Sequence, residues 1–280
     1  MRLLTIGDEA RLAAFLARTP ETAMFLRSNL RAAGIADKGK PYQGSYVGAF
    51  EGDALVGVAS FCWNGNMMLQ CSAALAPALA AAALAAKPKR RALGVLGPRA
   101  AVAAAIEIPA FAERRARLAA RQSIFAIDLA DLPAPTPAAA RVRPASGKDR
   151  ETAAAWRHDY LCETLGAAPG EATKKRAADE IDRAIAEARA YVLCVGDHRM
   201  AYAGFNATLP DLVQVGGLYC PPDERGLGYG RAVLLGALLA ARAKGVVRAV
   251  LFTSDDNMPT LRLAQALGFN ASGEYGVVFY

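Results

Sequence analysis

The chain has 280 residues, of which 54% are hydrophobic and 21% charged, and its formal net charge is +7. This composition excludes an intrinsically disordered protein and provides enough apolar residues for two domains with cores of their own. The five cysteines form no C-x-x-C pair and there are only two histidines, so neither a disulfide framework nor a structural zinc site is expected. The longest apolar run, 73–86, is short for a bilayer and contains Pro77, and acidic residues closely follow Met1, so we expect a cytoplasmic protein without a signal peptide.

The first half of the chain alternates strand-like and helix-like segments. In chain order we expect a strand at 3–6, helices at 9–17 and 22–33, hairpin strands at 45–50 and 55–63, a strand at 67–71, an alanine-rich helix, a strand at 93–96, a helix from Arg99 and a strand at 123–129. A dense basic run, Lys87, Lys89, Arg90 and Arg91, follows the alanine-rich helix. We interpret it as a solvated helix end, with phosphate or nucleic-acid contact as the alternatives.

A proline-rich segment divides the chain almost in half. Residues 132–140 carry three prolines that alternate with small residues, which is typical of an extended and fairly stiff spacer. We therefore expect one domain at 1–131, a linker at 132–140 and a second domain at 141–280.

The second half predicts a similar series with clearer boundaries. We expect strands at 141–144, 191–195, 200–209, 212–219, 246–252 and 275–280, and helices at 149–165, 173–190, 229–244 and from Pro259 to Gly268. Gly245 follows Lys244, as is usual where a helix ends.

A glycine-rich loop joins the strand at 212–219 to the helix at 229–244. Gly226, Gly228 and Gly230 have no Cβ, so an anion can approach the backbone N–H groups of the loop. The following helix directs its N-terminal amides and the positive end of its dipole into the same space. The loop lacks the Gly-Lys-Ser/Thr ending of a P-loop, and its glycines are too closely spaced for a dinucleotide fingerprint. We therefore expect a site for a pyrophosphate of another kind.

This region resembles the GCN5-related N-acetyltransferase (GNAT) superfamily. Arg225, Gly228 and Gly230 form the pattern Arg-x-x-Gly-x-Gly, and the segment 257–269 is similar to the family's Asn-x-x-Ala-x-x-Leu-Tyr-x-x-x-Gly-Phe signature. The resemblance covers residues 141–280. The first half repeats the element order without the loop, with Pro77 near the place of the glycines, so it resembles a degenerate second unit.

The resemblance implies an α+β fold in three layers: two GNAT-like domains, each with a mixed, mostly antiparallel twisted sheet flanked by helices. It also implies one acetyl-CoA per chain as co-substrate, held by the second domain, and no metal. The residues expected to hold the coenzyme are Leu218, Tyr219, Cys220, Arg225, Gly226, Leu227, Gly228, Tyr229, Gly230, Arg231, Asn257 and Leu263.

Three of these residues also have an ordinary structural interpretation. Arg225 is alternatively a surface cation, Asn257 a helix cap, and Cys220 a small buried hydrophobe rather than a nucleophile. His158 is interpreted as a surface or satisfied residue, with acceptor contact as the alternative, whereas Tyr160 and Glu163 lie in the region that shapes the acceptor pocket in the family.

The catalytic groups depart from the family pattern. The tyrosine credited as general acid would stand at Ala264, so the resemblance leaves Tyr219, Tyr275 or water to protonate the thiolate. No acidic base is evident on the strand at 212–219, which leaves a water relay to Glu163, Asp211 or His158. Our catalytic candidates are Tyr219, Tyr275 and Glu163.

The resemblance predicts an N-acetyltransferase of bacterial type that moves an acetyl group from acetyl-CoA to a primary amine of a small molecule or peptide. We expect a monomer or homodimer. A non-catalytic acyl-CoA-binding regulator is the alternative, favoured by Ala264, and a nucleic-acid-associated protein is a third, favoured only by the net positive charge.

Overall fold

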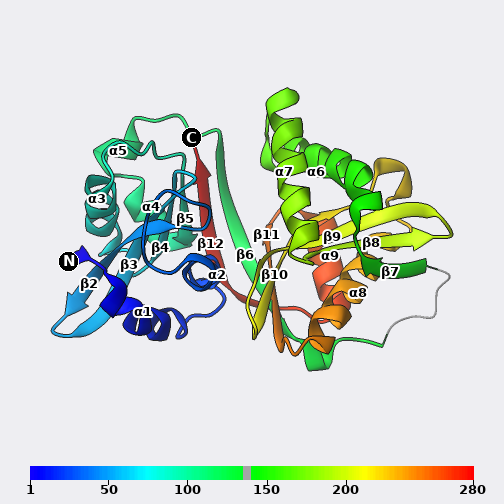
Figure 1. Ribbon diagram of the computed structural model, residues 1–280, viewed down its shortest axis with the longest axis horizontal. Helices are drawn as coiled ribbons and strands as arrows, with labels where there is room; N and C mark the ends of the chain where they lie inside the picture. The colour runs from blue at the N-terminus through cyan, green and yellow to red at the C-terminus, as the bar shows by residue number, and fades with distance from the viewer. Residues whose placement is uncertain (135–139) are drawn as a thin grey trace. The chain divides into compact units, whose positions relative to one another are not determined.

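The computed structural model describes residues 1–134 and 140–280 (Figure 1). They form two compact units, one of Met1–Ile124 with Ser272–Tyr280 and one of Phe125–Ala271. The chain passes between the units within β6 (Leu118–Asp128) and again at the start of β12 (Asn270–Phe279).

The first unit contains a mixed sheet with strand order β1-β2-β3-β4-β5-β12, in which β4 and β5 are parallel and the other pairs antiparallel. Its strands are β1 (Arg2–Leu3), β2 (Gly44–Glu51), β3 (Ala54–Cys62), β4 (Asn66–Gln70) and β5 (Gly94–Pro98), with most of β12. Its helices are α1 (Glu9–Leu16), α2 (Met24–Ala33), α3 (Ala76–Ala86), α4 (Arg99–Ala105) and α5 (Pro109–Ala112).

Neighbouring residues of this sheet point to opposite faces, which divides the core in two. Phe61 packs with α3 and α4, and its neighbour Cys62 packs with α1 and α2. Met67 and Met68 alternate in the same way. A layer of helices therefore covers each face of the sheet.

The second unit has the strand order β6-β11-β10-β9-β8-β7, in which β10 and β11 are parallel. Its strands, besides the end of β6, are β7 (Ala140–Pro144), β8 (Ala190–Val195), β9 (His198–Thr208), β10 (Leu212–Tyr219) and β11 (Arg248–Ser254). Its helices are α6 (Arg150–Leu165), α7 (Glu171–Ala186), α8 (Tyr229–Ala243) and α9 (Met258–Leu267).

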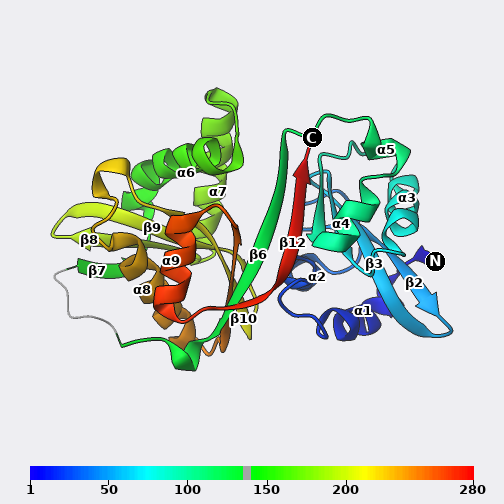
Figure 2. The ribbon, with the colours of Figure 1, turned by 180° about the vertical axis from the view of Figure 1, so that it is seen from behind.

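The helices of the second unit lie on opposite faces of its sheet. Tyr191 and Leu193 pack with α8 and α9, while Val192 and Cys194 pack with α6 and α7. Figure 1 shows α6 and α7, and Figure 2, from behind, shows α8 and α9. The expected three-layer arrangement is confirmed in both units.

A repeated hydrogen-bond motif supports the internal duplication. In the first unit Arg2 binds both oxygens of Asp8, at 2.7 and 2.6 Å, and Asp8 accepts a bond from the Thr5 amide. In the second unit Arg143 binds Asp149 at 2.7 and 2.9 Å, and Asp149 accepts a bond from the Ser146 amide. Both sets have the same sequence spacing and precede the first helix of their unit. We did not predict this motif from the sequence.

Most of the last strand of the second repeat lies in the first unit, and the end of the last strand of the first repeat lies in the second unit. β12 pairs antiparallel with β5, from Tyr275 opposite Pro98 to Phe279 opposite Gly94. The end of β6 belongs to the second unit, where β6 is next to β11 in the strand order. This division differs from the expected domains 1–131 and 141–280, because an apolar strand can pair with either sheet edge and its sequence does not select one.

The expected linker is also shorter at both ends. Leu132 is buried in the core of the second unit, and β7 already begins at Ala140. Residues 135–139 lie outside the described part of the chain.

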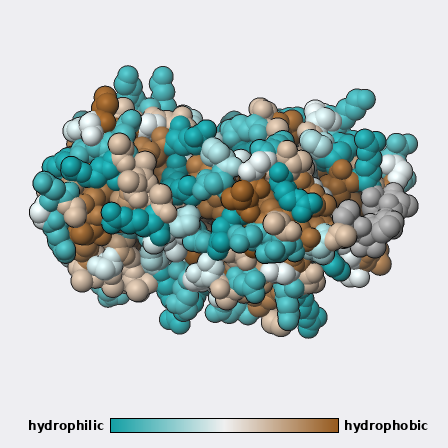
Figure 3. Space-filling view, turned by 90° about the horizontal axis from the view of Figure 1, so that it is seen from below, coloured by the Kyte–Doolittle hydropathy of each residue, from teal (hydrophilic) through white to brown (hydrophobic). Residues whose placement is uncertain are grey.

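Figure 3 shows hydrophilic and hydrophobic residues interspersed over the face that it draws. Within residues 1–134 and 140–280, we find no helix with the length and apolarity needed to span a bilayer.

Candidate coenzyme and acceptor site

The site begins where β10 leaves its parallel neighbour. Pairing of β10 with β11 runs from Leu212–Arg248 to Val215–Leu251, although both strands continue beyond these residues. The register of β10 against β9 shifts between Gly216 and Tyr219, around Gly217 with its φ of 71°. A β-bulge of this kind redirects backbone groups and opens the strand pair. The backbone of Leu218, Tyr219 and Cys220 follows directly after this opening.

The glycine loop leads from this opening into α8. A single 3-10 turn, Pro222–Glu224, is followed by Gly226 and Gly228 with φ values of 81° and 83°. Both φ values lie in the left-handed region that glycine tolerates best, and the space beside both Cα atoms is open. Leu227 between them is 63% exposed.

The N-terminus of α8 is uncapped. Gly228 is its N-cap residue, and no side chain in the described part of the chain provides a cap hydrogen bond. The amides of Tyr229, Gly230 and Arg231 therefore point outward from the positive end of a fifteen-residue helix. This geometry suits a phosphate group.

Gly230 lies against two other expected coenzyme residues. A Cβ built at Gly230 would be 3.5 Å from the Cys220 sulfur and 3.6 Å from a Leu263 methyl group. The structure thus brings Cys220 and Leu263 together beside the loop. Burial raises the pKa of the Cys220 thiol to about 11, which supports its interpretation as a neutral packing residue.

Arg225, Glu163 and Tyr219 form a connected network. The Arg225 Nη2 donates to Glu163 Oε2 at 2.8 Å, and its Nε donates to the Cys220 carbonyl at 3.0 Å. The Tyr219 hydroxyl donates to Glu163 Oε1 at 3.1 Å. Arg225 also lies 5.5 Å above the Tyr219 ring. The loop, the end of β10 and α6 therefore meet at one carboxylate.

The environment of Tyr219 keeps its hydroxyl protonated. Burial and the neighbouring Glu163 charge raise the pKa of Tyr219 to about 12. Its ring lies 6.4 Å from that of Trp156, centroid to centroid. The Tyr219 side chain is thus a neutral phenol across the physiological range.

A partly buried ion pair lies beside the bulge. The Arg157 Nε donates to Glu180 Oε2 at 2.7 Å, and Arg157 lies 5.0 Å above the Tyr160 ring. The φ of 71° at Gly217 favours glycine, and a Cβ there would come within 2.6 Å of the Arg157 guanidinium, which would have to move. Tyr160 belongs to this cluster and lies on α6, as Glu163 does. Burial raises the pKa of Tyr160. We missed Arg157 from the sequence because its partner Glu180 lies on another helix.

The other expected residues lie outside the network. His158 Nδ1 is 3.0 Å from Asp159 and its Nε2 3.8 Å from the Cys162 sulfur. Asp211 precedes β10, whose eight residues from Leu212 to Tyr219 span about 23 Å at 3.3 Å per step. Asp211 is therefore too far away to relay a proton to the end of the strand.

Tyr275 is a core residue of the first unit. It is 2% exposed, and its ring centroid lies 6.4 Å from that of Phe25. Burial raises its pKa. Because it belongs to the sheet of the first unit, it is not among the side chains that the second unit gathers around the loop.

Asn257 precedes α9, and Thr253 lies near the end of β11. The Asn257 side chain accepts a bond from the Thr260 amide at 3.3 Å and so caps α9, which agrees with its structural interpretation. The hydroxyl of Thr253 is buried and has no hydrogen-bond partner in the described part of the chain. Thr253 lies beyond the last β10–β11 pair, where a ligand could satisfy it. The sequence carried no signal for it.

Ala264, the position of the family's tyrosine, lies on the face of α9 that packs into the core and is fully buried. Among the described residues, no group of three or more His, Cys, Asp or Glu side chains is arranged to hold a metal ion.

Comparisons with known proteins agree with this geometry. The model of the acetyltransferase (GNAT) family matches residues 154–269, which include α8, the glycine loop and α9. The search of curated proteins found no match.

Similar solved structures cover the whole chain. A Drosophila protein aligns with 100% of this chain and 98% of its own, with a TM-score of 0.67 at 12% identity. A GCN5-related N-acetyltransferase from Sphaerobacter thermophilus aligns over 99% and 93%, with a TM-score of 0.63 at 14% identity. A tandem GNAT protein from the clavulanic acid biosynthesis pathway aligns over 99% and 97%, with a TM-score of 0.57 at 14% identity.

At these identities the structural likeness concerns the fold, whereas the match at 154–269 concerns the sequence itself. Residues 154–269 therefore belong to the acetyltransferase (GNAT) family, and the chain as a whole has the fold of a tandem GNAT protein.

Proposed function

We propose that the protein transfers an acetyl group from acetyl-CoA to a primary amine by direct transfer in a ternary complex. The observation that carries this proposal is the uncapped N-terminus of α8 beside the opening between β10 and β11. A helix terminus of this kind binds phosphates, and an opened strand pair offers backbone groups to an extended arm.

The residues present fit such a coenzyme. The amides from Gly226 to Arg231 would hold the pyrophosphate, and the backbone of Leu218 to Cys220 would hold the pantetheine arm. Leu263 would line the arm, and the buried Thr253 hydroxyl would find in it the hydrogen-bond partner that the described residues do not supply. When bound, acetyl-CoA supplies the thioester.

Glu163 and Tyr219 would carry the proton that the reaction moves. As the amine nitrogen bonds to the carbonyl carbon and the carbon–sulfur bond breaks, the nitrogen loses a proton and the thiolate gains one. Glu163 would accept the first proton and Tyr219 would donate the second. The direct hydrogen bond between them, 3.1 Å long, would then return the proton from Glu163 to Tyr219.

The first unit would have a supporting role. Its sequence has no glycine between Gln70 and Ala76, where the second unit has its loop, and Pro77 stands in the first turn of α3. We propose that this unit binds no coenzyme through that junction.

The alternative is a non-catalytic acyl-CoA-binding regulator, and the buried alanine at position 264 is the observation that favours it. Free thiol released from acetyl-CoA, measured with a panel of primary amines, separates the two functions. An enzyme releases thiol in an amine-dependent way, and Glu163→Gln suppresses that release. Tight acetyl-CoA binding without turnover on any amine would favour the regulator.

A further inference from the structure

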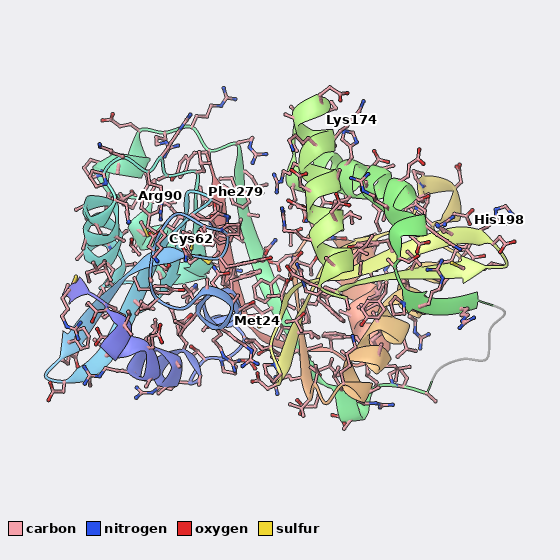
Figure 4. All side chains as sticks on the ribbon, in the orientation of Figure 1. Met24, Cys62, Arg90, Lys174, His198 and Phe279 are labelled. Carbon is pink, nitrogen blue, oxygen red and sulfur yellow. The ribbon has the colours of Figure 1, made fainter. Side chains whose placement is uncertain are left out.

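The basic run after α3 forms part of a built cavity on the first unit. Lys87 follows α3 directly as its C-cap residue. Arg90, labelled in Figure 4, is only 15% exposed, and its guanidinium donates to the Phe61 carbonyl and, at 2.9 Å, to Asp37 Oδ1. The run is therefore not simply a solvated helix end.

Asp37 joins this run to a second basic loop, residues 37–43, which contains Lys38 and Lys40. Its carboxylate lies 3.6 Å from the Lys87 ammonium and accepts a bond from the Ser45 hydroxyl at 2.6 Å. Burial opposes its ionisation, but the bonds from Arg90, Ser45 and the Gly39 amide lower the pKa of Asp37 to about 2. The charged Asp37 thus holds the two loops together, and the exposed Lys38, Lys40, Lys89 and Arg91 give the region an excess of positive charge.

The cavity between these loops has a volume of about 480 Å³, and its lining includes Trp63, Lys87, Lys89 and Arg90. A second cavity of about 330 Å³ shares Ala86 and Lys87 with it. Both volumes lie within the range of small-molecule sites. The first cavity combines an aromatic ring with three cationic side chains.

A strained turn supports Trp63. The amide of Gln43 donates to the Lys40 carbonyl at 3.1 Å, with Pro41 and Tyr42 between them. Tyr42 has a φ of 67° at the position where such a turn favours glycine. Its ring nevertheless lies 5.3 Å from that of Trp63. Strain of this kind persists where the surroundings require it and often marks ligand sites.

The cavity is not a remnant of a coenzyme site. α3 is the counterpart of α8 in element order, and the glycine loop lies at the N-terminus of α8. Ala86 and Lys87 lie at the C-terminus of α3, about 16 Å from its start at 1.5 Å per residue.

We propose that this cavity binds a nucleotide, with the base against Trp63 and the phosphates on Lys87, Lys89 and Arg90. Ammonium and guanidinium groups bind phosphate oxygens through charge-assisted hydrogen bonds, and a base stacks on an aromatic ring. The cationic groups gather around one concavity instead of forming an extended stripe, which favours a small ligand over a nucleic acid. Tyr42 acts as a positioning residue for Trp63.

Tryptophan fluorescence tests the proposal directly. The chain has two tryptophans, so Trp156→Phe leaves Trp63 as the only reporter. In this variant we expect ATP to change the fluorescence with saturation, whereas adenosine and tripolyphosphate each bind at least tenfold more weakly. Lys89→Gln should weaken ATP binding about tenfold and Lys87→Gln/Lys89→Gln about 100-fold, because each removes a charged phosphate contact.

Lys244→Gln is the matched control, because it removes an exposed lysine at the end of α8 in the second unit and should leave the titration unchanged. Tyr42→Gly should keep the circular dichroism spectrum and weaken ATP binding. The absence of a saturable response, or a response that Lys89→Gln leaves unchanged, would overturn the proposal. So would equal binding of tripolyphosphate, which indicates an adventitious ion only, or tighter binding of a single-stranded RNA oligonucleotide than of ATP.

Discussion

The two units share their architecture and differ at one junction. Each has a parallel pair of strands, a helix that follows the first of that pair, and the same Arg-to-Asp motif before its first helix. In the second unit the strand opens at a bulge and leads through a glycine loop to an uncapped helix. In the first unit a short segment without glycine leads to α3, with Pro77 in its first turn. The two units thus share a fold, and the residues that distinguish the proposed binding site are confined to a short loop.

The largest effect should come from closing that junction with a side chain. Gly228→Glu places bulk and a negative charge where phosphate would meet the α8 amides. We expect calorimetry to show at least a 100-fold loss of acetyl-CoA affinity, from one site per chain in the parent.

Gly245→Glu is the control for this variant. Gly245 follows the other end of α8 with a φ of 91° and open space around it, so the substitution has a similar backbone cost and adds the same charge. Equal loss of affinity in both variants, or two sites per parent chain, would contradict the contrast between the units.

The second-largest effect is expected from replacing Glu163, the carboxylate that Arg225 and Tyr219 both contact. Glu163→Gln keeps the shape and a hydrogen-bond partner for Tyr219 but removes the base, so we expect kcat to fall about 10²-fold to 10³-fold. Coenzyme affinity should be largely kept. Glu224→Gln, a change of the same kind in the turn before the loop, should leave kcat within about twofold. Similar rates for parent and Glu163→Gln would exclude Glu163 as the base.

The two candidate tyrosines provide a direct test between the units. Tyr219→Phe removes the proton donor of the second unit, and we expect kcat to fall about 10-fold to 100-fold. Because the pKa of Tyr219 is about 12, the parent rate should show no loss from its ionisation anywhere in the neutral range. Tyr275→Phe should change thermal stability and leave kcat unaltered. The reverse result would assign the proton to Tyr275.

Replacing the two aspartates of the repeated motif should lower the stability of the protein by different amounts. Asp149 is fully buried and binds both Arg143 and Arg199, so Asp149→Asn should cost about 3 kcal/mol, as for other broken buried ion pairs. Asp8→Asn should lower the free energy of unfolding by less, because Arg2, the partner of Asp8, is more exposed than Arg143. Hydrogen bonds from Arg143 and Arg2 hold the pKa of both carboxyl groups well below the usual range. Their stabilisation is therefore complete above about pH 4 and is lost on acidification below it, which urea unfolding at several pH values can measure.

The smallest effect is expected at Ala264. Ala264→Tyr restores the family residue, but the position is buried, so overpacking should lower stability by about 1–3 kcal/mol. We expect the rate to stay the same or fall. A rate increase without loss of stability would show that protonation limits turnover and that the site has kept room for the ring.

Local signals made most of the fold predictable. Glycines and prolines mark the ends of α8 and α9, and the predicted strands of both halves lie within a few residues of their observed positions. The choice of partner for β12 was not predictable, because its apolar pattern fits either sheet edge. The glycine loop was predictable because its residues are close together in the sequence. The hydrogen bond between Arg225 and Glu163 was not, because it joins distant parts of the chain. Trp63 and the basic run are also distant in the sequence, so the cavity that they line together could not be predicted from it.

The exchanged last strand has a consequence for synthesis on the ribosome. The sheet of the first unit receives β12 only from the final residues of the chain, and until then β5 has an unpaired edge. An unpaired edge is a site for misplaced pairing. The sheet of the first unit therefore cannot be completed when residues 1–124 emerge but only after the residues of β12 have been made. Truncations of the last ten residues should consequently damage the unit made first.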